Sequence, residues 1–152
     1  MTWRGLDMAN TDLADLIAAY FVDQKLLSAS TARLIAERRP VPTERLAGYD
    51  GRLFDWLAEM LNYGPPDGPE VAWPIILELV AQAPDEEALA FIGSGPVEDL
   101  VNKHGVQFEG PIVSQATTDS RFRLALRHVW PHDGVADTLK ELIAASRLVD
   151  RE

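Results

Sequence analysis

Apolar residues recur every three to four positions along most of the chain, which is the spacing of helices that bury one face. The first such set is Leu13, Leu16, Ile17 and Tyr20. Asn10 or Thr11 can cap the start of this helix, since their side chains accept hydrogen bonds from free N–H groups. The pattern predicts a second helix from about Ser30 to Arg38, which the following prolines, Pro40 and Pro42, would end.

The next helix lies before the most turn-rich stretch of the chain. Its apolar face is formed by Leu53, Leu57, Met60 and Leu61. Gly64 is a natural stop for it, and "PPDGPE" then predicts a short linker over residues 64–69. After the linker, Pro74 is tolerated in a first helical turn, so the pattern predicts a helix that begins close to Trp73.

Short helices follow, and most of them begin with proline or aspartate and end before glycine or proline. Their predicted starts are residues 84, 96, 111, 119 and 134. Asp119 and Asp133 are expected to be N-caps of the last two, and the final helix should turn inward Val135, Leu139, Leu142 and Ile143. No segment has a convincing strand pattern, and the uneven starts exclude a repeat of fixed period.

These elements predict an all-α fold in a single domain, residues 1–152. We expect about eight or nine mostly short helices, arranged as irregular stacked helical hairpins like those of an α-α superhelix. N-terminal helices would occupy residues 1–63 and a C-terminal helical array residues 70–152, on either side of the linker at 64–69.

Acidic residues are concentrated in the middle of the chain. The formal net charge is −10, and residues 67–109 alone carry 9 acidic and 1 basic residue. A nucleic-acid binder needs a basic face that displaces counterions, and this chain lacks the charge for one. The arginines that do gather have acids interleaved among them; they are Arg33, Arg38, Arg39, Arg45 and Arg52. The charge pattern therefore predicts no nucleic-acid partner and favours a basic protein partner.

The chain has no cysteine, which excludes a disulfide scaffold, a thiolate zinc site and a catalytic thiol. No apolar run approaches the roughly 18 residues of a membrane span. The N-terminal sequence has no basic start followed by an apolar run, so we expect neither a secretory signal nor a membrane partner. The sequence thus predicts a cytoplasmic protein, and nothing in it points to a cofactor.

The "GSGP" stretch, residues 93–96, raises the question of a phosphate-binding loop. A dinucleotide fingerprint requires a third glycine where this chain has Glu98, and the acidic pair Glu98 and Asp99 would repel an anion at the helix start. The structural interpretation is favoured. In it Gly93 ends a helix in the left-handed conformation, Gly95 permits a reversal, and Pro96 begins the next helix with Glu98 in a capping arrangement.

Few side chains suggest chemistry. His104 lies at the edge of an apolar helix face, where a bond to a carbonyl or a helix C-terminus is expected. His128 and His132 are four apart, a metal-ligand spacing on a continuous helix, but Pro131 should break that helix, so no metal is predicted. No nucleophile motif occurs. The weak catalytic candidates are Glu98, Asp99 and His104.

The four tryptophans sort by position. Trp56, Trp73 and Trp130 lie in or beside apolar helical segments and are expected in the core. Trp3, near the terminus, is expected to dock on the domain or to belong to an interface.

The second half contains a distinctive run, "I-G-x-G-P-x-E-D-L-x-x-x-H-G", preceded by Trp73 and followed by a helix with Phe122 that ends in Val129 and Trp130. Over about residues 70–131 the chain resembles a family of small bacterial all-helical proteins of unknown function. The resemblance implies no activity, ligand or partner. It implies that Glu98, Asp99 and His104 belong to a shared surface or polar network.

Two hypotheses about function follow. The favoured one is a non-enzymatic protein-interaction module with an acidic face, which neutralises a basic partner such as a toxin in one version. The other is an enzyme or small-ligand-binding protein with a polar site around Glu98, Asp99 and His104. The sequence leaves open whether the chain forms a homo-oligomer.

Overall fold

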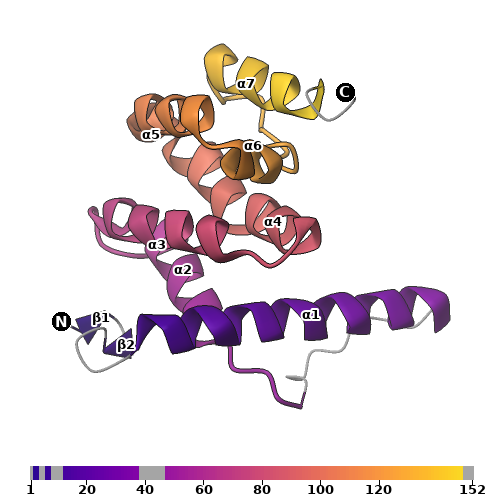
Figure 1. The fold of residues 1–152 in the computed structure, drawn as a ribbon. Coiled ribbons are helices and arrows are strands. Elements are labelled where there is room, and N and C mark those ends of the chain that lie inside the picture. The colour runs from indigo at the N-terminus through magenta and orange to yellow at the C-terminus, as the bar shows by residue number, and fades with distance from the viewer. Residues whose placement is uncertain (1, 4–5, 8–11, 38–46, 149–152) are drawn as a thin grey trace. The chain divides into compact units, whose positions relative to one another are not determined.

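A computed structural model describes residues 2–3, 6–7, 12–37 and 47–148 (Figure 1). Near the N-terminus, two-residue strands β1 (Thr2–Trp3) and β2 (Leu6–Asp7) pair antiparallel. The other elements are helices: α1 (Leu13–Glu37), α2 (Arg52–Asn62), α3 (Gly68–Gln82), α4 (Glu86–Ile92), the π-helical η1 (Gly93–Val97), α5 (Glu98–Thr118), α6 (Ser120–Leu126) and α7 (Asp137–Leu148). The all-helical prediction is confirmed.

The described residues form fewer separate α-helices than the eight or nine helices predicted, and several of them are longer. α1 is continuous through residue 30, where a second helix was expected to begin, because its sequence contains neither glycine nor proline. α3 begins at Gly68 rather than near Trp73 and runs through Pro74. Pro74 is exposed, so the carbonyl that it leaves without a helical partner lies near the surface.

α5 likewise joins two predicted helices. It contains a kink at His104, whose φ of −133° and ψ of 19° are not helical, and continues through Pro111, the predicted start of a separate helix. The predicted break before Gly105 is therefore present, but the next helix begins at once. No helix within the described residues combines the length and apolarity that crossing a bilayer requires.

The chain divides into two compact units, unit 1 (Met1–Trp56) and unit 2 (Leu57–Glu152). The division falls inside α2 and not at the predicted linker, residues 64–69. Residues 64–67 of that linker connect α2 to α3 within unit 2, whereas residues 68 and 69 already belong to α3. The grouping of the whole chain into one domain stays a prediction.

In unit 1, one carboxylate holds the chain that leads into α2. Asp23, on α1, is buried, and its two oxygens accept hydrogen bonds of 2.8 Å from the N–H groups of Asp50 and Gly51. Gly51 has a φ of 77°, which glycine adopts without strain. At the start of α1, Asp12 accepts from the N–H of Ala14 at 2.9 Å. The predicted caps Asn10 and Thr11 lie outside the described residues.

In unit 2, α6 is the central helix. It contacts α3, α4, η1, α5 and α7, and its apolar residues Phe122, Ala125 and Leu126 are fully buried. Figure 1 shows α3 and α4, then α5 and α6, then α7 in succession within this unit. The Trp73 ring meets Phe122 edge-on at 5.7 Å between centroids.

Predicted apolar faces and caps are mostly confirmed in unit 2. Asp119 accepts from the N–H groups of Arg121 and Phe122 at the start of α6. Asp133, however, is not an N-cap, because residues 133 and 134 form a turn and α7 begins at Asp137. The expected inward residues are buried except Leu142, which is half-buried; the others are Val135, Leu139 and Ile143.

The "GSGP" stretch joins α4 to α5 without a left-handed residue, so that part of the prediction is wrong. Gly93 is right-handed helical, with a φ of −62° and a ψ of −45°. Its Cβ, if present, would lie 1.9 Å from the carbonyl oxygen of Ala125 in α6. Gly93 is therefore needed for close helix packing. Gly95, with a φ of −109° and a ψ of −106°, is not helical, so the chain is kinked there, and Pro96 begins the helical segment that continues into α5, as predicted.

Candidate functional site

His104 lies at the kink of α5 and contacts the end of α2. Its side chain is half-buried, and Nε2 lies 2.7 Å from the carbonyl oxygen of Leu61. Because a carbonyl oxygen only accepts, Nε2 carries the hydrogen and donates it. His104 thus satisfies one of the last carbonyls of α2, which is the kind of contact that its sequence context favoured.

Three more polar side chains surround the same helix end. Asn62 donates from Nδ2 to the carbonyl of Ala58 at 2.7 Å and to Oδ2 of Asp99 at 3.3 Å. Its Oδ1 accepts from Nζ of Lys103. We call Asn62, Asp99, Lys103 and His104 the α2 corner. These contacts link α5 to the end of α2. The carboxylate of Asp99 and the ammonium group of Lys103 both bond to the side-chain amide of Asn62.

Glu98 points to a different segment. Its Oε1 accepts from the N–H of Trp130 at 2.8 Å, in the connection between α6 and α7. Four residues on, Asn102 accepts from the N–H of His132 at 2.8 Å and donates to the carbonyl of Trp130 at 3.1 Å. The candidate trio is therefore divided: Asp99 and His104 share the α2 corner, whereas Glu98 caps backbone beyond α6. Glu98 does not cap the start of its own helix.

Arg147, on α7, holds the same connection from the other side. Its Nε donates to the carbonyl of Arg127 at 2.9 Å and its Nη2 to that of Val129 at 2.7 Å. Its guanidinium carbon lies 5.1 Å from the centre of the Trp130 ring, over the face of the indole. We call Glu98, Asn102 and Arg147 the Trp130 clamp.

Trp130 is the main departure from the predicted core. Its side chain is 72% exposed, whereas Trp56 is 2% exposed and Trp73 is half-buried. The reason is that α6 ends at Leu126, so Trp130 follows the helix and does not lie on its buried face. The sequence pattern predicted that this helix would continue to Trp130 and end at Pro131, which is four residues too late. Trp3 lies in β1, and its side chain is outside the described residues.

Other arginines of unit 2 also donate to carbonyls at helix ends. Arg121 donates from Nε to the carbonyl of Val80 at 3.1 Å and from Nη2 to that of Ala83, at the end of α3. Arg123 donates to the carbonyl of Ala116 near the end of α5. Such pairs satisfy free carbonyls and place positive charge at the negative end of the helix dipole.

Carboxylates dominate the exposed charge of unit 2, which holds 16 acidic and 7 basic residues. Those of α3 and of the start of α4 form what we call the acidic surface: Asp67, Glu70, Glu78, Asp85, Glu86 and Glu87, all exposed. Two of them accept from neutral amides, Glu70 from Gln107 at 2.9 Å and Glu78 from Gln82 at 3.0 Å. Asp85 caps α4 through the N–H of Ala88 at 2.8 Å.

Comparison with known protein families finds one family model that matches most of this chain. A family model described as a family of unknown function, DUF6869, matches residues 45–149. The chain belongs to this family. The match covers α2 to α7 and extends beyond the residues, about 70–131, on which the resemblance rested. No curated protein and no solved structure is recognisably similar to the chain.

For this DUF6869 member, the described residues do not gather a metal-binding set. Nowhere in residues 12–37 or 47–148 do three or more His, Asp or Glu side chains come together as metal ligands. His128 and His132 follow the end of α6, so they do not share a helix face, and the N–H of His132 donates to Asn102 of the Trp130 clamp. Arg38, Arg39 and Arg45 lie outside the described residues, and Arg52 pairs with Asp50 at 2.9 Å.

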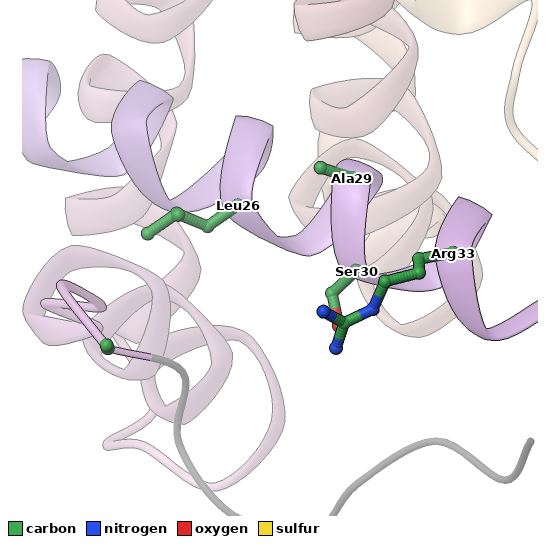
Figure 2. Close-up of a pocket in the computed structure, with 5 residues that line it drawn as sticks. Leu26, Ala29, Ser30 and Arg33 are labelled. Atoms are coloured by element: carbon green, nitrogen blue, oxygen red, sulfur yellow. The ribbon is translucent and has the colours of Figure 1, made fainter.

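Unit 1 contains a hollow of about 280 Å³ along α1, lined by Leu26, Ala29, Ser30, Arg33 and Ala47 (Figure 2). This part of α1 precedes the region matched by DUF6869. Figure 2 shows the Arg33 side chain reaching back toward Ser30. These two groups have the chemistry to bind a small anion. Arg33 and Ala29 are exposed, so the hollow is open to solvent and would hold such a ligand weakly.

Proposed function

We propose that the chain is a non-enzymatic protein-interaction module whose acidic surface binds a basic protein partner. The supporting observation is the unequal use of charge in unit 2. Arg121, Arg123 and Arg147 donate to backbone carbonyls of their own unit, whereas the carboxylates of the acidic surface are exposed. Neutralisation of a basic toxin is one version of this function.

The consequence is electrostatic. An arginine with two N–H groups on fixed carbonyls cannot swing out to neutralise a surface carboxylate without leaving those carbonyls unsatisfied. The negative field of unit 2 therefore persists outside the molecule. Such a field attracts a basic partner, speeds its association and disfavours acidic competitors.

The acidic surface also has a favourable arrangement along α3. Asp67 precedes the helix and Glu78 follows eleven residues later, a separation of about three turns, so both point to the same side. Glu70 lies about 60° from Asp67 around the helix axis. Three carboxylates thus follow one side of α3, a pattern suited to a row of basic side chains.

The test is capture of basic proteins from lysate of the native cell on immobilised chain, followed by mass spectrometry. The double variant with Glu78→Lys and Glu86→Lys should abolish the capture. The control is Asp15→Lys, which reverses the charge of an exposed residue in unit 1 and should leave the capture intact. Asp85 is left unchanged because its reversal would remove the cap of α4. The proposal fails if no basic protein is enriched, or if the double variant retains what the wild type retains.

The second hypothesis, an enzyme or ligand site at Glu98, Asp99 and His104, has less support. Each side chain is bonded to a different partner, and Glu98 faces a different segment from the other two. No observation favours a reaction there. The cytoplasmic location stays a prediction from the sequence.

A further inference from the structure

Trp130 combines an exposed side chain with a fixed backbone. Its N–H is held by Glu98, its carbonyl by Asn102, and the carbonyl of the preceding Val129 by Arg147. Its indole is nevertheless 72% exposed. A residue whose N–H and carbonyl are both hydrogen-bonded loses little further backbone freedom when a partner contacts it.

One face of the indole is covered and the rest is open. Arg147 lies over the ring at 5.1 Å, and two of its N–H groups are already directed to carbonyls. Arg147 therefore covers one face of the indole ring, and the other face is open to solvent. Tryptophans in this condition supply much of the binding energy at protein interfaces, because they bury a large, rigid surface.

We propose that Trp130 is the anchor on which a basic protein segment docks, with an arginine or an aliphatic side chain of the partner packed on the open face of the indole. The inference rests on the proposed function, because the charge of unit 2 identifies the partner. Fixed negative charge draws the partner in but adds little affinity, so a basic partner also needs an apolar anchor.

The charges around Trp130 are compatible with this occupant. Asp133 and Asp137 follow it within seven residues, and both are exposed. Arg147 lies behind the ring, and Lys140 donates to the carbonyl of Asp133 at 2.8 Å. An arginine side chain of the partner would gain a cation–π contact on the open face of the indole.

The experiment measures peptide affinity by calorimetry at low salt, about 50 mM. The probes are a peptide of about 12 alternating arginine and leucine residues, which spans a standard binding site, and an acidic counterpart with glutamate in place of arginine. The variants are Trp130→Ala, the control Tyr63→Ala, and the double reversal Glu78→Lys with Glu86→Lys. Tyr63 is 78% exposed in the same unit, but its N–H makes an ordinary helical bond to Glu59.

The basic peptide should bind, and Trp130→Ala should weaken it at least tenfold, whereas Tyr63→Ala should change the dissociation constant less than twofold. In the wild type, the basic peptide should also protect Trp130 from oxidation by N-bromosuccinimide, a readout that does not depend on the folding of any variant. If the double reversal weakens binding but Trp130→Ala does not, or the indole is not protected, the anchor is wrong and the proposed function stands. If the basic peptide does not bind, or the acidic one binds as well, both are wrong.

Discussion

Charged side chains contact the helix ends of the two units differently: unit 1 uses a buried carboxylate before α2, whereas unit 2 uses arginines at helix ends in addition to carboxylates that cap helix starts. In unit 1, the buried carboxylate of Asp23 accepts from two N–H groups just before α2 begins. In unit 2, Arg121, Arg123 and Arg147 donate to carbonyls where helices end. Both choices follow from the helix itself, since N-termini present free N–H groups and C-termini present free carbonyls.

The difference has a consequence for the surface. Unit 1 contains 8 acidic and 7 basic residues, so its formal charges nearly balance. Unit 2 contains 16 acidic and 7 basic residues, and three of its arginines are directed to backbone carbonyls rather than to surface carboxylates. Structural arginines thus shape the field by which we expect the partner to be recognised.

The largest loss of stability is expected from a substitution that disturbs the packing of two helices. Gly93→Ala places a methyl group on the backbone of α6, where the Cβ would lie 1.9 Å from the Ala125 oxygen, and α4 must move away. We expect a loss of at least about 3 kcal/mol in the free energy of unfolding, measured by urea titration with circular dichroism. The control is Gly134→Ala, because no atom lies within 4 Å of that Cβ. Equal stability of the two variants would contradict the close approach of α4 and α6.

The helical class and the buried faces could be predicted because periodicity reports burial directly. The set Leu53, Leu57, Met60 and Leu61 is buried as its spacing indicated. Breaks were harder, because proline lowers helix stability without forbidding a helix whose other face is buried. Pro74 and Pro111 both lie inside helices for that reason.

The candidate site was predictable only as a set of polar residues near one another in sequence. The bonds of Asp99 and His104 to the end of α2 span 37 and 43 residues, and those of Glu98 and Asn102 to the Trp130 segment span 28 to 32. No local pattern encodes such partners. Gly93 shows the same limit, since a helix stop and a close contact both require glycine.

Asp23→Ala tests the carboxylate that accepts from the N–H groups before α2 in unit 1. The substitution leaves two buried or half-buried N–H groups without their carboxylate, so we expect a loss of about 3 kcal/mol in the free energy of unfolding. Asp15→Ala, an exposed carboxylate on the same helix, is the matched control and should change stability by less than about 0.5 kcal/mol. If Asp23→Ala were equally mild, the carboxylate would not hold the start of α2.

Arg121→Gln tests the arginine that donates to carbonyls at the end of α3 in unit 2. Losing two charge-assisted bonds at the end of α3 should cost about 2 kcal/mol, again by urea titration. Arg121→Lys keeps the charge but lacks the planar fork, so it should recover less than half of the loss. Full recovery by lysine would mean that charge near the helix end matters and the two directed bonds do not.

The smallest expected effect concerns pH and separates the cores of the two units. Burial, and secondarily the neighbouring Tyr49, raises the pKa of Tyr20 on α1 above its ordinary value. Above about pH 10 the unfolded chain loses the tyrosine proton while the folded chain keeps it, so rising pH favours unfolding. The stabilisation is complete below that pH and is lost above it, by about 1 kcal/mol between pH 10 and 11.

Tyr20→Phe removes the titrating hydroxyl and should flatten this alkaline decline, whereas Tyr63→Phe, at a side chain 78% exposed, should leave it unchanged. Thermal melts of the three proteins between about pH 8 and 11 measure the difference. Near-ultraviolet signals of Trp56 in unit 1 and Trp73 in unit 2 report which core opens first. Because Tyr20 belongs to unit 1, loss of the Trp73 signal before that of Trp56 would place the alkaline weakness in the wrong unit.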